Sequence, residues 1–338
     1  MRIVMGNRII GLTALAALAA APWLGAYPVF LMKLMCFALF ACSSNLLLGY
    51  VGLLSFGQAA FFGMAGYVTG SALRDHGLTS EMALLVGTGV SAMLGLVFGA
   101  LAIRCKGIYF AMVTLALAQM IYFLCVQMPF TGGEDGLQGV PRGMLFGVVG
   151  LDNDLRLYFF VLAISVAAFL FIGRVINSPF GRILTALKEN EARTISLGYN
   201  INRFKLLAFV ISAALAGLAG SMKTLVLGFA TLSDVYWTTS GTVILMTLLG
   251  GLGTRLGPIV GAVIVVCIES KLGEFGAWLA DITHIAWFQG LGDSVSLLTG
   301  VMFVCCVLLF RRGIVGECQH WLKQKSWPNW VSGRTVRD

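Results

Sequence analysis

The sequence predicts an all-α, polytopic membrane protein with about ten transmembrane helices. Of its 338 residues, 58% are hydrophobic and only 11% are charged, whereas soluble domains carry about 25% charged residues to face water. The mean hydropathy is +0.90. Apolar runs follow one another along the chain with short polar breaks, and several approach the ~20 residues that cross a bilayer.

The predicted spans follow directly from these apolar runs. A run without charges favours a helix in the bilayer, because every backbone N–H and C=O must be bonded internally there. The spans are 9–26, 28–48, 56–73, 82–103, 108–128, 157–173, 206–223, 238–249, 258–268 and 294–310.

Glycine marks irregular places among these spans. The short ranges 238–249 and 258–268 flank the Gly-rich stretch 250–257, so they form either one broken helix or two tilted helices. Glycines in the range 56–73 allow a re-entrant turn at its start. Small residues four positions apart, such as Ala216 and Gly220, allow helices to pack closely.

The distribution of Lys and Arg predicts the orientation. Basic loops stay in the cytoplasm, and with the N-terminus inside, alternation places the acidic segments 131–156 and 271–293 outside. The basic segments on the cytoplasmic side are 2–8, 104–106, 174–205, 255 and 311–338. Residues 1–22 also resemble a secretory signal peptide, but further spans follow at once, so a retained first helix is preferred over cleavage.

The polar segment 174–205 is too patterned to be a simple turn. Ser178 followed by Pro179 is typical of a helix start. Apolar and charged residues then alternate at helical spacing as far as Gly198, which predicts one amphipathic helix. Such a helix lies on the lipid surface or docks into a groove of a partner protein, and two acids among the bases favour the partner.

Composition and spacing argue against several kinds of site. The eight cysteines lie mostly in apolar runs, with no Cys-x-x-Cys and no His at ligand spacing, so no metal site or disulfide framework is expected. The stretch LSFGQ at 54–58 resembles the signature of ABC ATPases, but the chain has no Gly-x4-Gly-Lys loop to hold phosphate. The net charge of +8 is concentrated in loops and the tail, which indicates membrane topology rather than nucleic-acid binding.

Five stretches resemble one known family. They are 45–63; 107–116; 131–137 with 140–142; 178–182 with 186–191 and 197–198; and 205–209 with 213–220 and 250–261. In this order they resemble the branched-chain amino acid ABC transporter permeases of the LivM type, over residues 40–316. The family usually carries His where Gln58 stands and a small residue where Glu134 stands.

The resemblance implies a partnered transporter. A second, related permease subunit would complete the pathway, two cytoplasmic ABC ATPase subunits would hydrolyse ATP, and a periplasmic substrate-binding protein would deliver the solute. This chain itself would be no enzyme and would hold no cofactor. The loop 174–205 would hold the coupling helix, with its contact face at Glu189, Glu191, Ala192, Arg193 and Gly198.

Neutral polar residues in or beside apolar runs are candidates for the translocation path, since amino acids carry a carboxylate and an ammonium group. They are Ser55, Gln58, Thr114, Gln119 and Thr247. For each, a hydrogen bond between helices is the simpler interpretation. Apart from residues near span ends, such as Lys33 and Glu269, no acid or base is expected within the membrane, which disfavours a proton- or sodium-driven carrier.

We therefore expect residues 1–338 to form a single transmembrane permease domain with a coupling loop at 174–205 and a basic tail at 311–338. It is expected in the bacterial inner membrane with both termini cytoplasmic. The expected function is ATP-driven import of branched-chain or related amino acids by alternating access. The alternatives are a similar permease for urea or short amides, an ATP-independent secondary carrier or channel, and a membrane-embedded enzyme, which no clustered His, Asp or Cys supports.

Overall fold

The computed structural model describes residues 18–25, 27–145, 147, 149–283, 300, 301, 304 and 313–317, and most of them are helical. The elements in chain order are η1 (Ala21–Leu24), α2 (Pro28–Asn45), η2 (Leu46–Val51), α3 (Gln58–Arg74), α4 (Ser80–Ala102), α5 (Ile108–Gln127), η3 (Pro129–Thr131), η4 (Gly133–Asp135), β1 (Met144–Leu145), β2 (Val149–Gly150), α6 (Asp154–Asn177), α7 (Pro179–Glu189), α8 (Glu191–Ser196), α9 (Ile201–Leu227), α10 (Leu232–Val235), α11 (Trp237–Gly250) and α12 (Gly257–Thr283).

Helices long and apolar enough to cross a bilayer confirm an all-α, polytopic membrane fold. Within the described residues they are Pro28–Val51, Ser80–Ala102, Ile108–Gln127, Asp154–Asn177 and Ile201–Leu227. The predicted spans 9–26 and 294–310 lie largely outside the described residues. The total of about ten spans therefore stays a prediction.

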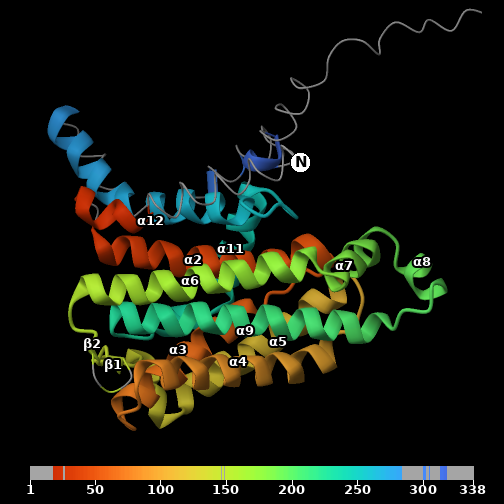
Figure 1. Cartoon of the computed structure of the whole chain (residues 1–338), viewed down its shortest axis with the longest axis horizontal. Coiled ribbons are helices and arrows are strands. Elements are labelled where there is room, and N and C mark those ends of the chain that lie inside the picture. Colours follow the sequence, from red (N-terminus) through yellow and green to blue (C-terminus); the bar gives the residue numbers. More distant parts are fainter. Residues whose placement is uncertain are drawn as a thin grey trace, which may run out of the picture. The chain divides into compact units, whose positions relative to one another are not determined.

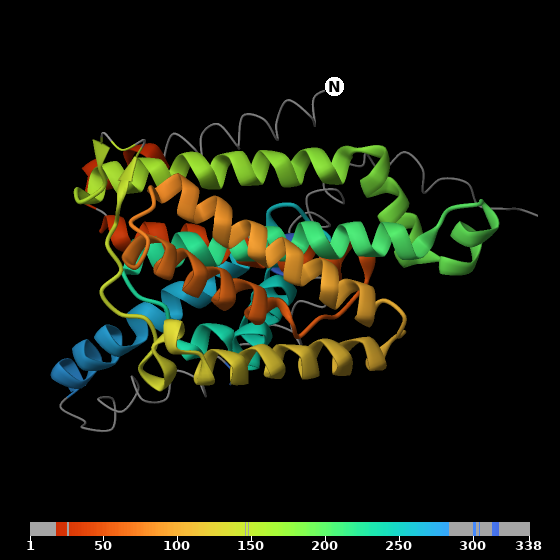
Figure 2. The same ribbon diagram turned by 90° about the horizontal axis from the view of Figure 1, so that it is seen from below.

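The chain divides into two compact units, Met1–Ile244 and Leu245–Asp338, with the boundary inside α11. In the first unit α9 is the central helix, because it packs against α2, α3 and α4, while α2 also packs against α6. Figure 1 shows α2, α6 and α9 running side by side, and Figure 2 shows α4 crossing this row.

Small residues allow this close packing. A Cβ atom at Gly220 of α9 would lie 1.9 Å from the carbonyl oxygen of Phe62 in α3. A Cβ at Gly95 of α4 would lie 2.4 Å from the Cβ of Ala213 in α9. No methyl group fits at either position, so the helices meet through backbone and small side chains, as in other membrane bundles.

The loop between α5 and α6 lies at the end of the first unit opposite α7 and α8 (Figure 1). It holds a two-stranded antiparallel sheet in which Met144 pairs with Gly150. A β-bridge between Leu137 and Ala230 fastens this loop to the segment that follows α9. Below, the two ends are called the α7 end, with α7 and α8, and the β end, with β1 and β2.

In the second unit, the end of α11 and the start of α12 are in backbone contact. A Cβ at Gly250 would lie 1.8 Å from the Gly257 carbonyl oxygen, and one at Gly261 would lie 1.8 Å from that of Met246. The ranges 238–249 and 258–268 are therefore two separate helices. α12 continues to Thr283, so the predicted end at 268 is wrong. The sequence becomes more polar there but contains no Pro to stop the helix.

Candidate functional site

α7 begins where the sequence predicts and is tied to the bundle at its far end. Ser178 is the N-cap, since its hydroxyl accepts a hydrogen bond from the Gly181 N–H, and Pro179 occupies the first turn. Near the end of α7, Lys188 Nζ donates to the carbonyl oxygen of Gly49 in η2 at 2.8 Å. The helix is thus fixed to the point where the chain leaves the α2–η2 span.

The apolar face of α7 packs onto the chain's own helices. Leu184 and Leu187, 0% and 4% exposed, form a cluster with Val51, Ile201 and Ala208. These residues come from η2 and α9. Neither lipid nor a partner protein covers this face, because the bundle already does.

A separate short helix, α8, follows α7. The prediction of one continuous amphipathic helix is wrong at Asn190, which has an extended backbone with φ −156° and ψ 101°. Its side chain accepts a hydrogen bond from the Arg193 N–H at 3.0 Å and so caps α8. Asn favours this role over a helix interior. Gly198, with φ +85°, follows the end of α8, as the sequence predicts.

The contact residues expected from the resemblance lie on or beside α8. Glu189, Ala192, Arg193 and Gly198 are exposed, whereas Glu191 is half-buried. The structure adds three large apolar side chains that the sequence analysis missed: Ile195 is 57% exposed, Leu197 68% and Tyr199 43%. We call these three the α8 surface. The sequence could have indicated them, because they are apolar residues in a segment that is too polar to enter the bilayer. Exposed apolar patches of this kind mark contact sites.

Glu191 anchors α8 to the bundle. Its carboxylate lies 3.1 Å from Lys205 Nζ and 3.6 Å from Lys106 Nζ. Lys205 is only 8% exposed, whereas Lys106 is 77% exposed. The buried lysine of α9 therefore fixes the start of α8, and Glu191 has a partner within this chain.

Non-helical backbone separates η2 from α3. Gly52, with φ +81°, ends η2, and α3 starts only at Gln58. We call residues 52–57 the break. Gln58 donates to Ser212 of α9, and Ser212 lies about 10 Å further along that helix than Lys205. The break therefore reaches into the bundle from the α7 end, where irregular backbone needs cover from protein or water.

Side chains from two other helices bind the break. Thr114 Oγ1 of α5 accepts a hydrogen bond from the Phe56 N–H at 3.2 Å. Ser240 Oγ of α11 donates to the Phe56 carbonyl at 2.7 Å and accepts from the Ala59 N–H at 2.8 Å. Ser240 thus joins the backbone on both sides of the α3 start.

Three of the five expected path residues meet at the break. Ser55, Gln58 and Thr114 are all at most 3% exposed. Gln119 lies further along α5 and is partly exposed, while Thr247 is buried in the second unit.

The sequence analysis missed Ser212 and Ser240. A serine in an apolar run binds either its own helix or a distant backbone group, and the two cases give the same pattern. Only the fold shows that both serines reach the segment around the α3 start.

A buried ion pair lies towards the β end. Lys223 Nζ of α9 lies 2.5 Å from both carboxylate oxygens of Asp234 in α10, and the two side chains are 8% and 12% exposed. Asp234 also accepts from the N–H and hydroxyl of Thr231 in a capping box. Both charges lie near the ends of predicted spans, and the sequence does not show that they meet.

The described residues contain no candidate metal centre. Within these ranges, no three His, Cys, Asp or Glu side chains come together as ligands. Cys36, Cys42 and Cys125 are buried free cysteines. The candidate functional features are thus the α8 surface and the break.

The known proteins that this chain is similar to are membrane permeases. Residues 29–307 match the family described as "Branched-chain amino acid transport system / permease component". The high-affinity branched-chain amino acid transport system permease protein LivM of Salmonella typhimurium is 30% identical over 257 residues, which cover 69% of this chain and 60% of that protein. The probable LivM of Methanocaldococcus jannaschii is 27% identical over 267 residues, 68% of this chain and 76% of that protein. The ribose import permease protein RbsC of Haemophilus influenzae is 26% identical over 233 residues, 67% of each chain. The chain thus spans only 60% of the length of the Salmonella relative.

Proposed function

The chain belongs to the family of branched-chain amino acid transport permeases, and on that premise we propose that it is the membrane-spanning subunit of an ATP-driven importer of branched-chain or related amino acids. Its proposed partners are a second related permease, two cytoplasmic ABC ATPases that hydrolyse the ATP, and a periplasmic substrate-binding protein. The proposed location is the bacterial inner membrane, with both termini and the α7 end in the cytoplasm. The basic segments of the sequence support this orientation.

The observation that carries this proposal is an exposed apolar surface on a firmly attached support. The α8 surface and Arg193 are exposed, with Ile195 and Tyr199 also lining a hollow beside Arg104 and Asn202, whereas α7 is held by Leu184 and by the bond from Lys188 to Gly49. An ATPase subunit that binds α8 would therefore transmit its own conformational change through α7 to the end of η2. The break begins directly after η2, so the same movement would reach the backbone inside the bundle.

The proposed path follows the break. Gly52 and Leu54 are exposed on its surface, and backbone that is neither helical nor lipid-compatible must face water or another protein there. We assign the path or its supporting wall to Ser55, Gln58 and Thr114 at the break and to Gln119 further along α5. Thr247 of the second unit stays a prediction from the sequence. Alternating access would then open and close this segment as the helices around it tilt.

The α8 surface has a direct test by copurification from mild detergent. Leu197→Asp and Arg193→Glu are expected to lose the ATPase subunits, because a central contact is often worth at least about 2 kcal/mol. Arg182→Glu is the matched control, since it reverses the same charge at an exposed position on α7. Full recovery of both ATPases with either α8 variant would refute the docking site.

A permease of this type for another solute, such as urea, a short amide or a sugar, is the second candidate. The similarity to a ribose import permease favours keeping it open. Uptake of labelled leucine into proteoliposomes holding the complete complex, with unlabelled solutes as competitors, separates these substrates. Leucine uptake by this chain alone and without ATP would instead establish a secondary carrier and refute the importer.

A further inference from the structure

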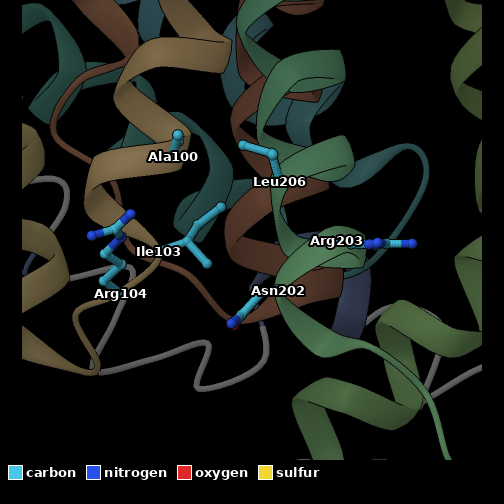
Figure 3. Close-up of a pocket in the computed structure, with 7 residues that line it drawn as sticks. Ala100, Ile103, Arg104, Asn202, Arg203 and Leu206 are labelled. Carbon is cyan, nitrogen blue, oxygen red and sulfur yellow. The ribbon is translucent and has the colours of Figure 1, made fainter.

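A groove opens between α4 and α9 at the α7 end of the first unit. Its volume is about 240 Å³. The residues that border it include Ala100, Ile103, Arg104, Asn202, Arg203 and Leu206, shown in Figure 3.

The groove is apolar on its bundle side and polar at its outer end. Ala100 and Leu206 lie further from the α7 end than Arg104 and Asn202, because α4 runs towards that end and α9 starts there. A second hollow of about 390 Å³ shares Arg104 and Asn202 and adds Lys106, Glu191 and two side chains of the α8 surface, Ile195 and Tyr199. Together the two hollows are amphipathic along the direction of the helices.

The outer end carries excess positive charge. Lys106 and Lys205 both pair with the single carboxylate of Glu191. None of the acids in the described part of the chain forms an ion pair with Arg104, which is exposed. Figure 3 shows Ile103 and Leu206 between α4 and α9, Arg104 at the end of α4, and the guanidinium of Arg203 on the far side of α9.

An exposed apolar stripe of α4 leads to the groove. Met93 is 70% exposed and Val97 46%, and Ala100 and Arg104 continue the same face at helical spacing. In a membrane, such a stripe is met by lipid chains. The occupant that fits its end has an apolar chain and an anionic head.

We propose that this groove binds an anionic phospholipid. One acyl chain lies along Ala100 and Leu206, and the phosphate group binds Arg104 and the side-chain amide of Asn202. A guanidinium matches phosphate geometry with parallel hydrogen bonds, and basic pockets between membrane helices bind such head groups. The lipid would lie beside Lys106 and so next to the ion pairs that anchor α8.

Native mass spectrometry of the full chain with its copurified subunits tests this site. The probes are phosphatidylglycerol and phosphatidylcholine with the same acyl chains, and phosphatidylglycerol is expected to bind about tenfold more tightly. Arg104→Gln is expected to weaken phosphatidylglycerol binding about fivefold. Arg182→Gln is the matched control, since it removes the same charge at an exposed position of α7 that lines neither hollow, and its effect stays below about twofold. Ala100→Trp fills the apolar wall and is expected to weaken binding with the charge unchanged.

Three results would overturn the proposal. Equal affinity for the two lipids would show that the head group is not recognised. Equal losses in Arg104→Gln and Arg182→Gln would show diffuse attraction to surface charge instead of a site. A photoreactive residue at position 100 that crosslinks in membranes to a second protein rather than to lipid would show that protein covers the groove.

Discussion

The buried pair of Lys223 and Asp234 gives the sharpest test of how the β end is held together. It joins α9 to α10, and both carboxylate oxygens lie 2.5 Å from the ammonium nitrogen. Lys223→Met removes the charge but keeps the length of the side chain. Asp234→Asn removes the other charge but keeps the shape and the acceptor that caps Thr231.

Each single replacement leaves one buried charge without its partner. Loss of one partner of a buried pair costs about 3–5 kcal/mol. We expect about 3 kcal/mol for each single variant, the lower end of that range, because the side chains keep 8% and 12% exposure and water reaches the remaining charge. Replacing both, as Lys223→Met with Asp234→Asn, removes the unpaired charge and is expected to restore most of the stability.

The assay is thermal unfolding of the purified chain in detergent, analysed as a double-mutant cycle. Asp75→Asn is the control, because Arg74 and Asp75 form an exposed pair at 40% and 38% exposure, and such pairs contribute little. No measurable shift is expected for this control. Single variants as stable as the parent chain, or a double variant less stable than both singles, would refute the reasoning.

Three further predictions concern packing and the break. Gly220→Ala is expected to lower the free energy of unfolding by about 1–3 kcal/mol through overpacking. Gly173→Ala, with open space around its Cβ, should raise this free energy by up to ~1 kcal/mol. The opposite order of the two variants in thermal unfolding would contradict the close contact of α9 with α3. Ser240→Ala leaves the Phe56 carbonyl and the Ala59 N–H without their partner, at about 1–3 kcal/mol each, and hydrogen exchange should rise at 56–59. Unchanged exchange there would count against the role of Ser240 at the α3 start. Leu184→Ala, in the cluster under α7, should lower the free energy of unfolding by about 2–5 kcal/mol. Leu197→Asp should change this free energy by less than ~0.5 kcal/mol. Similar changes in both variants would mean that α8 is as buried as α7.

Much of the fold could be predicted because apolar length maps directly onto membrane helices. The predicted spans at 82–103 and 108–128 coincide closely with α4 and α5. The helix start at Ser178 and the helix end at Gly198 could also be predicted, because an N-cap and a left-handed glycine depend only on neighbouring residues in the sequence.

The sequence could not show features that depend on distant residues. Asn190 is an ordinary polar residue in an amphipathic pattern. Only its capping of α8 shows that two separate helices, and not one continuous helix, lie there. Lys223 and Asp234 are both charges near span ends, and their pairing requires the turn at Gly228. The role of Ser240 at the break depends on α11 reaching the start of α3, which no local pattern records.

The short α11 has a consequence for how the chain enters the membrane during synthesis. Its 14 residues make about 21 Å of helix, less than the ~30 Å hydrocarbon core, so on its own it is a weak signal for the insertion machinery. The backbone contacts at Gly250 and Gly261 join its end to α12, which has 27 residues. We therefore expect the two helices to insert together as a hairpin. Substitutions at these glycines would then reduce the yield of correctly inserted protein before they affect transport.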